Sequence, residues 1–193
     1  MTDRKPKIIS VANQKGGVGK TTTTVNLATA LVLRGKRVLI LDLDPQGNAS
    51  TSLGVDSQKR KGTSYDFLVG GSSLESVTTN LGNEGFFLVP STVDLSSADL
   101  TLHNKHNANR HLRGKIDKNS LKNYKLDYIL IDCPPSLNLL TLNALVASDT
   151  VLVPLQSEFL PLEGLSQLML SVKKIRGTEN TKLRFEGVVL TMF

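Results

Sequence analysis

The sequence predicts an α/β fold in which a mostly parallel sheet carries helices on both faces. Apolar segments of strand length alternate with segments of helical periodicity along the chain, as in folds built from strand-helix-strand units. The strand-length segments are continuous runs of Val, Ile and Leu, which is typical of parallel strands covered on both faces. The length of 193 residues predicts a single domain, residues 1–193, with a sizeable core.

The first third of the chain predicts one complete strand-helix-strand unit. A strand is expected at residues 7–12, which are apolar on both faces. Residues 21–34 carry apolar side chains at helical spacing, and Gly35 follows them at a position suited to ending a helix. The second strand is expected at residues 37–41, which read R-V-L-I-L.

The middle of the chain, from Gly54 onward, is more polar and carries weaker signals. Short helices are expected at residues 64–69 and 73–79. A third strand is expected at residues 85–90, where the run G-F-F-L-V is ended by a proline. Asp94 is expected to cap the helix that follows it.

The last part of the chain returns to regular alternation. The expected elements are a strand at 126–132, a helix at 137–147, a strand at 150–155, a helix at 163–175 and a strand at 185–192. The runs Y-I-L-I-D and V-L-V-P-L are of the buried type. Parallel strands joined in this way end at one edge of the sheet, where ligands of open α/β folds bind.

A glycine-rich turn, N-Q-K-G-G-V-G-K-T-T at residues 13–22, joins the first strand to the first helix. Glycines let the backbone turn its N–H groups inward around phosphate oxygens. Lys20 is expected to contact the β- and γ-phosphates, Thr21 to bind Mg²⁺ through its hydroxyl, and Thr22 to donate to the α-phosphate. The residues assigned to nucleotide binding are Lys15, Gly16, Gly17, Val18, Gly19, Lys20, Thr21 and Thr22.

Two further segments place carboxylates at the same edge of the sheet. The string D-L-D-P-Q-G-N, residues 42–48, directly follows the second strand. Asp42 and Asp44 are two residues apart on an extended chain, so both can face a nucleotide bound in the loop. Asp132 ends the strand Y-I-L-I-D, where a carboxylate can hold a magnesium-bound water against the phosphate oxygens. Cys133, beside it, is expected to be a packed residue.

Together these motifs resemble those of the ParA/Soj family of partition ATPases. The general phosphate-loop pattern would place a glycine at Gln14, whereas this chain has Lys15 directly before two glycines. That arrangement resembles the deviant Walker A loop, the string at 42–48 resembles the A′ motif, and the strand ending at Asp132 resembles Walker B. The resemblance covers nearly the whole chain in order and implies a P-loop NTPase fold of the deviant Walker A type.

The resemblance also implies roles for individual residues. Lys15 is expected to cross the interface of an ATP-dependent homodimer to the partner's nucleotide, as an arginine finger does, and Gly16 to lie where the subunits approach. Asp44 is expected to position and polarise the attacking water, so Lys15, Lys20 and Asp44 form the catalytic set. The expected magnesium residues are Thr21, Asp42 and Asp132, with Asp42 in a supporting position.

The function that the resemblance implies is an ATP-hydrolysing molecular switch for chromosome or plasmid partition. ATP and Mg²⁺ are the expected cofactors. The dimer is expected to bind double-stranded DNA without sequence specificity, and a ParB-type partner to stimulate hydrolysis through a short basic segment. No membrane contact is expected, and the protein is placed in the cytoplasm, associated with the nucleoid.

The charge composition agrees with a polyanionic partner such as DNA. Lysine and arginine outnumber aspartate and glutamate by 23 to 17, which gives a net charge of +6 and favours a polyanion as partner. A solvated basic surface would leave the same composition. The excess is concentrated in residues 103–125; His103, His106 and His111 lie there without the cysteine or carboxylate partners of a metal site.

Other sequence features limit the protein class. No run approaches the roughly eighteen apolar residues of a membrane span, and the N-terminus lacks a secretory h-region. A single cysteine fits a reducing compartment and argues against an iron protein of the nitrogenase-reductase type, which needs two per subunit. A septum-positioning ATPase of the MinD kind, and a non-catalytic fragment that binds DNA or a partner, stay open as alternatives.

The resemblance stops at V-V-L-T-M-F, whereas members of the family usually continue well past this point. The chain is therefore expected to lack the family's C-terminal part, which carries residues flanking the adenine and basic residues that grip DNA. A sheet ended at residues 185–192 would expose an edge and an uncovered apolar face. The stretch Ser157 to Leu165 resembles a family segment near the dimer interface, with no residue assigned.

Overall fold

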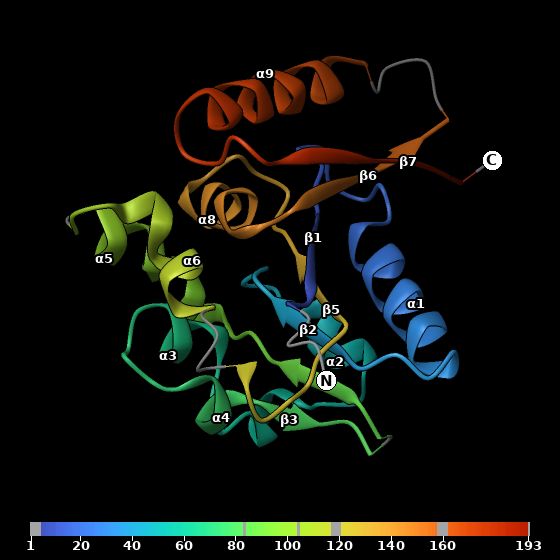
Figure 1. Cartoon of the computed structure of the whole chain (residues 1–193), viewed down its shortest axis with the longest axis vertical. Helices are drawn as coiled ribbons and strands as arrows, with labels where there is room; N and C mark the ends of the chain where they lie inside the picture. Colours follow the sequence, from blue (N-terminus) through green and yellow to red (C-terminus); the bar gives the residue numbers. More distant parts are fainter. Residues whose placement is uncertain (1–4, 83, 104, 117–120, 158–161, 193) are drawn as a thin grey trace.

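The computed structural model describes residues 5–82, 84–103, 105–116, 121–157 and 162–192. Within them seven strands form one sheet in the order β3-β4-β2-β5-β1-β6-β7 (Figure 1). Neighbouring strands are parallel except β3, which is antiparallel to β4. The strands are β1 (Lys7–Val11), β2 (Val38–Asp42), β3 (Thr79–Asn80), β4 (Phe86–Val89), β5 (Tyr128–Asp132), β6 (Thr150–Gln156) and β7 (Arg184–Thr191). The expected α/β class is confirmed.

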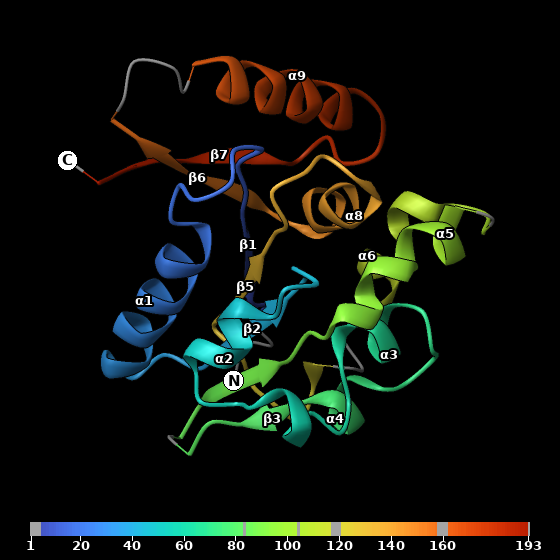
Figure 2. The same ribbon diagram turned by 180° about the vertical axis from the view of Figure 1, so that it is seen from behind.

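Helices cover both faces of this sheet. Figures 1 and 2 show α1 on the opposite side of the strands from α5 and α6. The α-helices are α1 (Lys20–Leu33), α2 (Asn48–Ser52), α3 (Ser64–Leu68), α4 (Leu74–Val77), α5 (Ala98–His103), α6 (His111–Lys115), α8 (Leu139–Ala147) and α9 (Leu162–Thr178). The 3-10 helices are η1 (Ser57–Lys59), η2 (Val93–Ser97) and η3 (Ala108–Arg110).

The apolar strands supply two separate cores because successive side chains point to opposite faces. Ile9 and Ile40 pack in the core under α1. Ile8 and Leu39 pack in the larger core on the other face, which also contains apolar side chains of α3, α5, α6, α8 and α9. Burial on both faces explains why these strands read as continuous apolar runs.

The register of the central strands decides the position of the site. Val11 at the end of β1 pairs with Asp132 at the end of β5. Asp132 in turn pairs with Asp42 at the end of β2. Three strands that lie side by side therefore end level with one another, and the loops that follow them start from the same edge of the sheet.

Several expected elements differ in detail. The helix expected at 73–79 ends at Val77, and the chain then forms β3, which the sequence analysis missed. A strand of two residues is too short to show the alternation of a strand in the sequence. It forms only because it pairs with β4, which comes later in the chain. Asp94 is not the N-cap: Thr92 holds that position with an extended backbone, and Asp94 lies in the first turn of η2. Gly47 is followed directly by α2, a short helix that the sequence did not predict.

The edge formed by β7 is exposed, as expected from the sequence. Phe185, Val188 and Leu190 are large apolar side chains that remain exposed on this strand. Residues 158–161 of the stretch Ser157 to Leu165 lie outside the described residues, so its position relative to an interface stays a prediction. Among the described residues, no helix combines the length and the apolar character needed to cross a membrane.

Candidate nucleotide-binding site

The loop between β1 and α1 has the backbone that an anion site needs. Gly17 and Gly19 have φ values of 74° and 84°, a left-handed conformation that glycine adopts without a side-chain penalty. Gly19 is the N-cap of α1 and provides no side-chain hydrogen bond to the helix. The first backbone N–H groups of α1, from Lys20 onward, are therefore not capped by the side chain of the N-cap residue. They lie at the N-terminus of the helix, where a negatively charged group such as phosphate is favoured.

Two residues outside the glycine-rich core fix this loop to the sheet. Asn13 donates from Nδ2 to the carbonyl oxygen of Pro154 on β6 at 2.7 Å, and its Oδ1 accepts from the N–H of Lys15 at 3.1 Å. Thr191 on β7 donates to the carbonyl oxygen of Val18 at 2.9 Å. A Cβ at Gly19 would lie 3.4 Å from the methyl group of Thr191, so the strand packs directly against the loop.

The two signature lysines take different positions. Lys20 is buried, and its Nζ donates to the carbonyl oxygen of Lys15 at 3.0 Å. Burial lowers the pKa of Lys20, and the nearby carboxylates of Asp132 and Asp44 act in the opposite direction. Lys15 is exposed, with its Nζ 3.3 Å from Oε1 of Gln156 at the end of β6. One lysine thus lies inside the loop and the other outside it.

Asp132 connects the end of β5 to the first turns of α1. Its Oδ2 accepts from the hydroxyl of Thr21 at 2.8 Å, and its Oδ1 accepts from the hydroxyl of Thr24 at 3.1 Å. Burial, and then repulsion from Asp42, raise the pKa of Asp132 to about 7, although the two threonine hydroxyls act against the increase. The contact with Thr24 was not predicted; its signal was the last of four consecutive threonines, three residues after Thr21 and so on the same face of the helix.

Asp42 is equally buried but is held by its own loop. Its Oδ2 accepts from the N–H of Ser50 at 2.9 Å and from the hydroxyl of Ser50 at 2.6 Å. Its Oδ1 accepts from the N–H of Asp44 at 3.2 Å. Burial raises its pKa to about 6 in spite of these hydrogen bonds. The hydroxyl of Ser50 also accepts from the N–H of Ser91, which links the loop to the end of β4.

Asp44 begins the sharp turn of the A′ string. Its side chain accepts from the N–H of Gln46 at 3.0 Å, and its carbonyl oxygen accepts from the N–H of Gly47 at 2.9 Å. It is one of the three buried carboxylates at this edge, with Asp42 and Asp132. Asp132 thus contacts the start of α1 through Thr21, Asp44 lies close enough to Lys20 to oppose the lowering of its pKa, and Asp42 is held by its own loop beside them.

Arg60 holds the other side of the A′ turn, a role with no local sequence signal. Its guanidinium donates to the carbonyl oxygen of Ser91 at 2.5 Å, to the hydroxyl of Thr51 at 2.8 Å and to the carbonyl oxygen of Val55 at 2.9 Å. A Cβ at Gly47 would lie 2.4 Å from Nη1 of Arg60. Gly47 has a φ of 61°, and a Cβ there would also lie 2.9 Å from the backbone carbonyl oxygen of Ser91, so both its own conformation and this neighbouring backbone require glycine.

The oxygen groups at this edge suit magnesium when a phosphate supplies further ligands. Mg²⁺ is bound in nucleotide sites by one or two carboxylates, waters and phosphate oxygens. The hydroxyl of Thr21 and the carboxylate of Asp132 are adjacent hard-oxygen groups at the start of α1. The described residues contain no group of three or more His, Cys, Asp or Glu side chains able to hold a metal, so these protein groups would act together with the nucleotide.

Cys133 follows Asp132 and is buried, as expected. Its N–H donates to the carbonyl oxygen of Val11 at 3.2 Å. Burial raises the pKa of its thiol, which disfavours the reactive thiolate. Cys133 is therefore a packing residue that continues the pairing of β5 with β1.

The sequence matches a known family model and is similar to two named bacterial proteins. A family model described as an AAA domain matches residues 6–185. The chromosome partitioning protein ParA of Caulobacter vibrioides is 46% identical over 187 residues, which cover 97% of this chain and 70% of the relative. The sporulation initiation inhibitor protein Soj of Bacillus subtilis is 47% identical over 187 residues, which cover 96% of this chain and 72% of the relative.

Two solved structures superpose closely on this chain. Cobyrinic acid a,c-diamide synthase from Mycobacterium smegmatis, with bound ADP and magnesium, superposes with a TM-score of 0.91 at 35% identity, covering 98% of this chain and 76% of that one. A plasmid partition protein from Borrelia burgdorferi superposes with a TM-score of 0.79 at 30% identity, covering 98% of this chain and 80% of that one.

Proposed function

The chain belongs to the ParA/Soj family of partition ATPases, and from this premise we propose that it is an ATP-hydrolysing switch that acts in chromosome or plasmid partition. The observation that carries the proposal is the arrangement at the sheet edge, where Thr21 donates to Asp132 and the buried Lys20 lies near the carboxylates of Asp132 and Asp44. ATP and Mg²⁺ are the proposed cofactors, in line with the ADP and magnesium bound by the similar synthase.

In this proposal each residue acts on a defined part of the nucleotide. The backbone N–H groups of the loop and the ammonium group of Lys20 bind the β- and γ-phosphates. Thr21 and Asp132 hold Mg²⁺, which supplies positive charge against the phosphate oxygens. Asp44 orients the attacking water, and the turn from Asp44 to Gly47 fixes its backbone. Asp42 supports the magnesium shell through the loop that it anchors.

We further propose that ATP binding forms a homodimer in which Lys15 reaches the nucleotide of the second copy. The position of the loop supports this, because Lys15, Gly16 and Gly17 form its exposed outer side. A Cβ at Gly16 would meet no atom of its own chain within 4 Å. A cation from a second subunit would neutralise charge that develops on the transferred phosphoryl group.

The proposed partners follow from the family. The ATP-bound dimer binds double-stranded DNA without sequence specificity, and a ParB-type protein stimulates hydrolysis and release. The protein would then act in the cytoplasm on the nucleoid. The net charge of +6 supports a polyanionic partner.

Measuring Mg²⁺-dependent ATP binding and hydrolysis, with and without DNA, tests this proposal. Lys20→Ala serves as the paired variant, since it removes the buried ammonium from the loop. We expect the wild-type chain to bind and hydrolyse ATP and Lys20→Ala to lose nucleotide binding. Turnover that persisted in Lys20→Ala would contradict the assignment of the loop. Binding without any turnover would favour a non-catalytic DNA-binding or partner-binding role.

A further inference from the structure

Two segments far apart in the sequence meet through Arg110, Arg113 and Glu179 and are both rich in basic residues; we call them the basic junction. The first segment, residues 103–116, includes η3 and α6 and contains no acidic residue. Its basic side chains are Lys105, Arg110, Arg113 and Lys115. The second segment, residues 173–184, includes the end of α9 and the turn into β7. Its basic side chains are Lys173, Lys174, Arg176, Lys182 and Arg184.

The basic junction carries the charge excess of the whole chain. Its two segments hold nine of the 23 basic residues and one of the 17 acidic residues, Glu179. Fourteen basic and sixteen acidic residues remain elsewhere, so the rest of the chain has a net charge of −2. The total of +6 is thus the sum of a strongly basic surface and a slightly acidic remainder.

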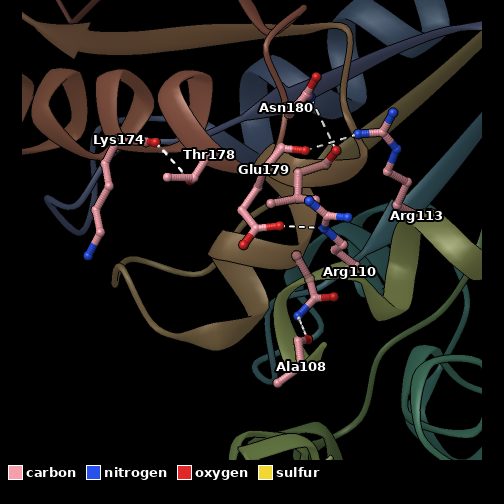
Figure 3. A network of polar contacts seen from close by, with 9 residues as sticks. Ala108, Arg110, Arg113, Lys174, Thr178, Glu179 and Asn180 are labelled. Atoms are coloured by element: carbon pink, nitrogen blue, oxygen red, sulfur yellow. Dashed lines mark hydrogen bonds and ion pairs between the residues drawn. The ribbon is translucent and has the colours of Figure 1, made fainter. Parts of the chain in front are cut away.

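Glu179 joins the two segments (Figure 3). Its carboxylate pairs with the Nε of Arg110, and its backbone carbonyl oxygen accepts from Nη1 of Arg113 at 3.3 Å. Arg110 nevertheless keeps 51% of its side chain exposed. Both arginines are therefore oriented by the end of α9 while their outer surfaces remain available to solvent.

Hydrogen bonds to helix α8 hold both segments in place. Asn143 donates to the carbonyl oxygen of Ala108 at 2.8 Å and accepts from the N–H of Leu112 at 3.1 Å, which fixes η3 and the start of α6. Asn180 donates to the carbonyl oxygens of Val146 and Ser148 at the end of α8. These hydrogen bonds fix the backbone of both segments to the same helix.

We propose that the basic junction is the surface on which this protein holds the phosphate backbone of double-stranded DNA. The inference rests on the proposed DNA binding and assigns it to a place in the fold. Arginine suits this task because its planar guanidinium donates two hydrogen bonds to one phosphate. Contacts to phosphates carry no sequence information, so a surface of this kind would bind DNA without specificity.

The α6 segment of the basic junction favours DNA over a lipid surface, because the exposed side chains among its described residues are all charged or polar. Association with a membrane needs an apolar face beside the positive charges. The described residues of the basic junction include no exposed large apolar side chain. Beside its α9 segment, however, the exposed Leu170 and Phe185 line a groove together with Lys173 and Arg176. The exposed residues that accompany the cations are polar, such as His106, Asn107 and Thr181.

The test is the salt dependence of DNA binding with ATP and Mg²⁺, using a duplex of arbitrary sequence. One variant, Lys105→Gln/Arg113→Gln, changes the α6 segment, and a second, Lys173→Gln/Lys174→Gln, changes the α9 segment. Both variants leave the pair between Arg110 and Glu179 in place, and the first removes the hydrogen bond from Arg113 to the carbonyl oxygen of Glu179. A control, Arg34→Gln/Lys36→Gln, removes two exposed cations at the end of α1 on the other side of the sheet. ATP binding and thermal unfolding are measured for all of them.

We expect each junction variant to weaken DNA binding by about tenfold or more and to reduce the slope of log K against log[salt] by about 2. The control should change both quantities less, with ATP binding equal in all variants. If both junction variants bind DNA as the control does, the assignment of this surface is wrong although DNA binding stands. If the wild type binds no DNA, or binds anionic phosphatidylglycerol vesicles instead, the proposed DNA partner itself is wrong.

Discussion

Asp42 and Asp132 are neighbours on adjoining strands, and both are fully buried, yet they are held in different ways. The hydrogen bonds of Asp42 come from its own loop, from backbone N–H groups and the hydroxyl of Ser50. Those of Asp132 come from the hydroxyls of Thr21 and Thr24 on α1. Backbone N–H groups have fixed directions, whereas a hydroxyl can rotate and exchange its partner for a cation.

The difference separates two kinds of residue at one sheet edge. The A′ side, with Asp42, Ser50 and Arg60, forms a closed network that positions Asp44. The α1 side, with Asp132 and its two threonines, presents oxygen groups next to the phosphate loop. Substitutions on the α1 side and at Asp44 should therefore act on nucleotide chemistry, and substitutions in the A′ network should act on stability.

The largest expected effect is that of changing Asp44, the A′ residue proposed to position the attacking water. Asp44→Ala should reduce the rate of ATP hydrolysis by roughly 100-fold, because a positioned base contributes about 10² to 10⁴ to a rate. ATP binding should persist, since Lys20 and the phosphate loop are unchanged. Single-turnover hydrolysis and nucleotide titration measure the two quantities separately. Normal hydrolysis by Asp44→Ala would show that another group orients the water.

A smaller effect, on stability, is expected from Ser50→Ala. The hydroxyl of Ser50 donates to Asp42 and accepts from the N–H of Ser91, so its removal leaves two buried groups short of a partner. We expect the free energy of unfolding to fall by about 2 kcal/mol, measured by urea denaturation. Ser52→Ala is the matched control, because Ser52 is exposed on the same helix. Equal losses in the two variants would show that the network through Ser50 adds no stability.

Sequence reasoning succeeded where the signal is local. The strands that carry the site are continuous apolar runs, and the loops that follow them contain their own functional residues within a few positions. The sheet edge, the glycine-rich loop and the three carboxylates could therefore be predicted together. The register that makes Asp42 and Asp132 neighbours follows from parallel pairing, which the strand-helix alternation indicates.

Sequence reasoning failed where a contact joins distant positions. Arg60 belongs to a polar stretch with no motif, yet it binds Ser91, 31 positions away. Thr191 reaches the phosphate loop from a strand 173 positions later, and Glu179 pairs with Arg110 across 69 positions. Each contact depends on how the elements pack, and a lone arginine, threonine or glutamate gives no sign of its partner. The basic junction was therefore visible only as a local excess of charge.

The smallest expected effect concerns the buried carboxyl group of Asp132 and its contribution to folding stability. Burial raises the pKa of Asp132 to about 7, above the ordinary value of 3.8. The folded protein therefore binds a proton more tightly than the unfolded chain does. Without magnesium, this group favours folding fully at acidic pH, and its contribution is lost as pH rises from about 4 to about 7.

Asp132→Asn removes this titration but keeps an oxygen that can accept from one threonine. In the absence of magnesium we expect the variant to be more stable than the wild type by about 1 kcal/mol near pH 7.5, and the difference to shrink or reverse near pH 5. Urea denaturation in the presence of a chelator, at both pH values, measures it. A difference that does not depend on pH would show that packing, and not the buried charge of Asp132, sets its effect. Added Mg²⁺ and ATP should reverse the order at neutral pH, because the wild-type carboxylate can bind the cation and the amide cannot replace its charge.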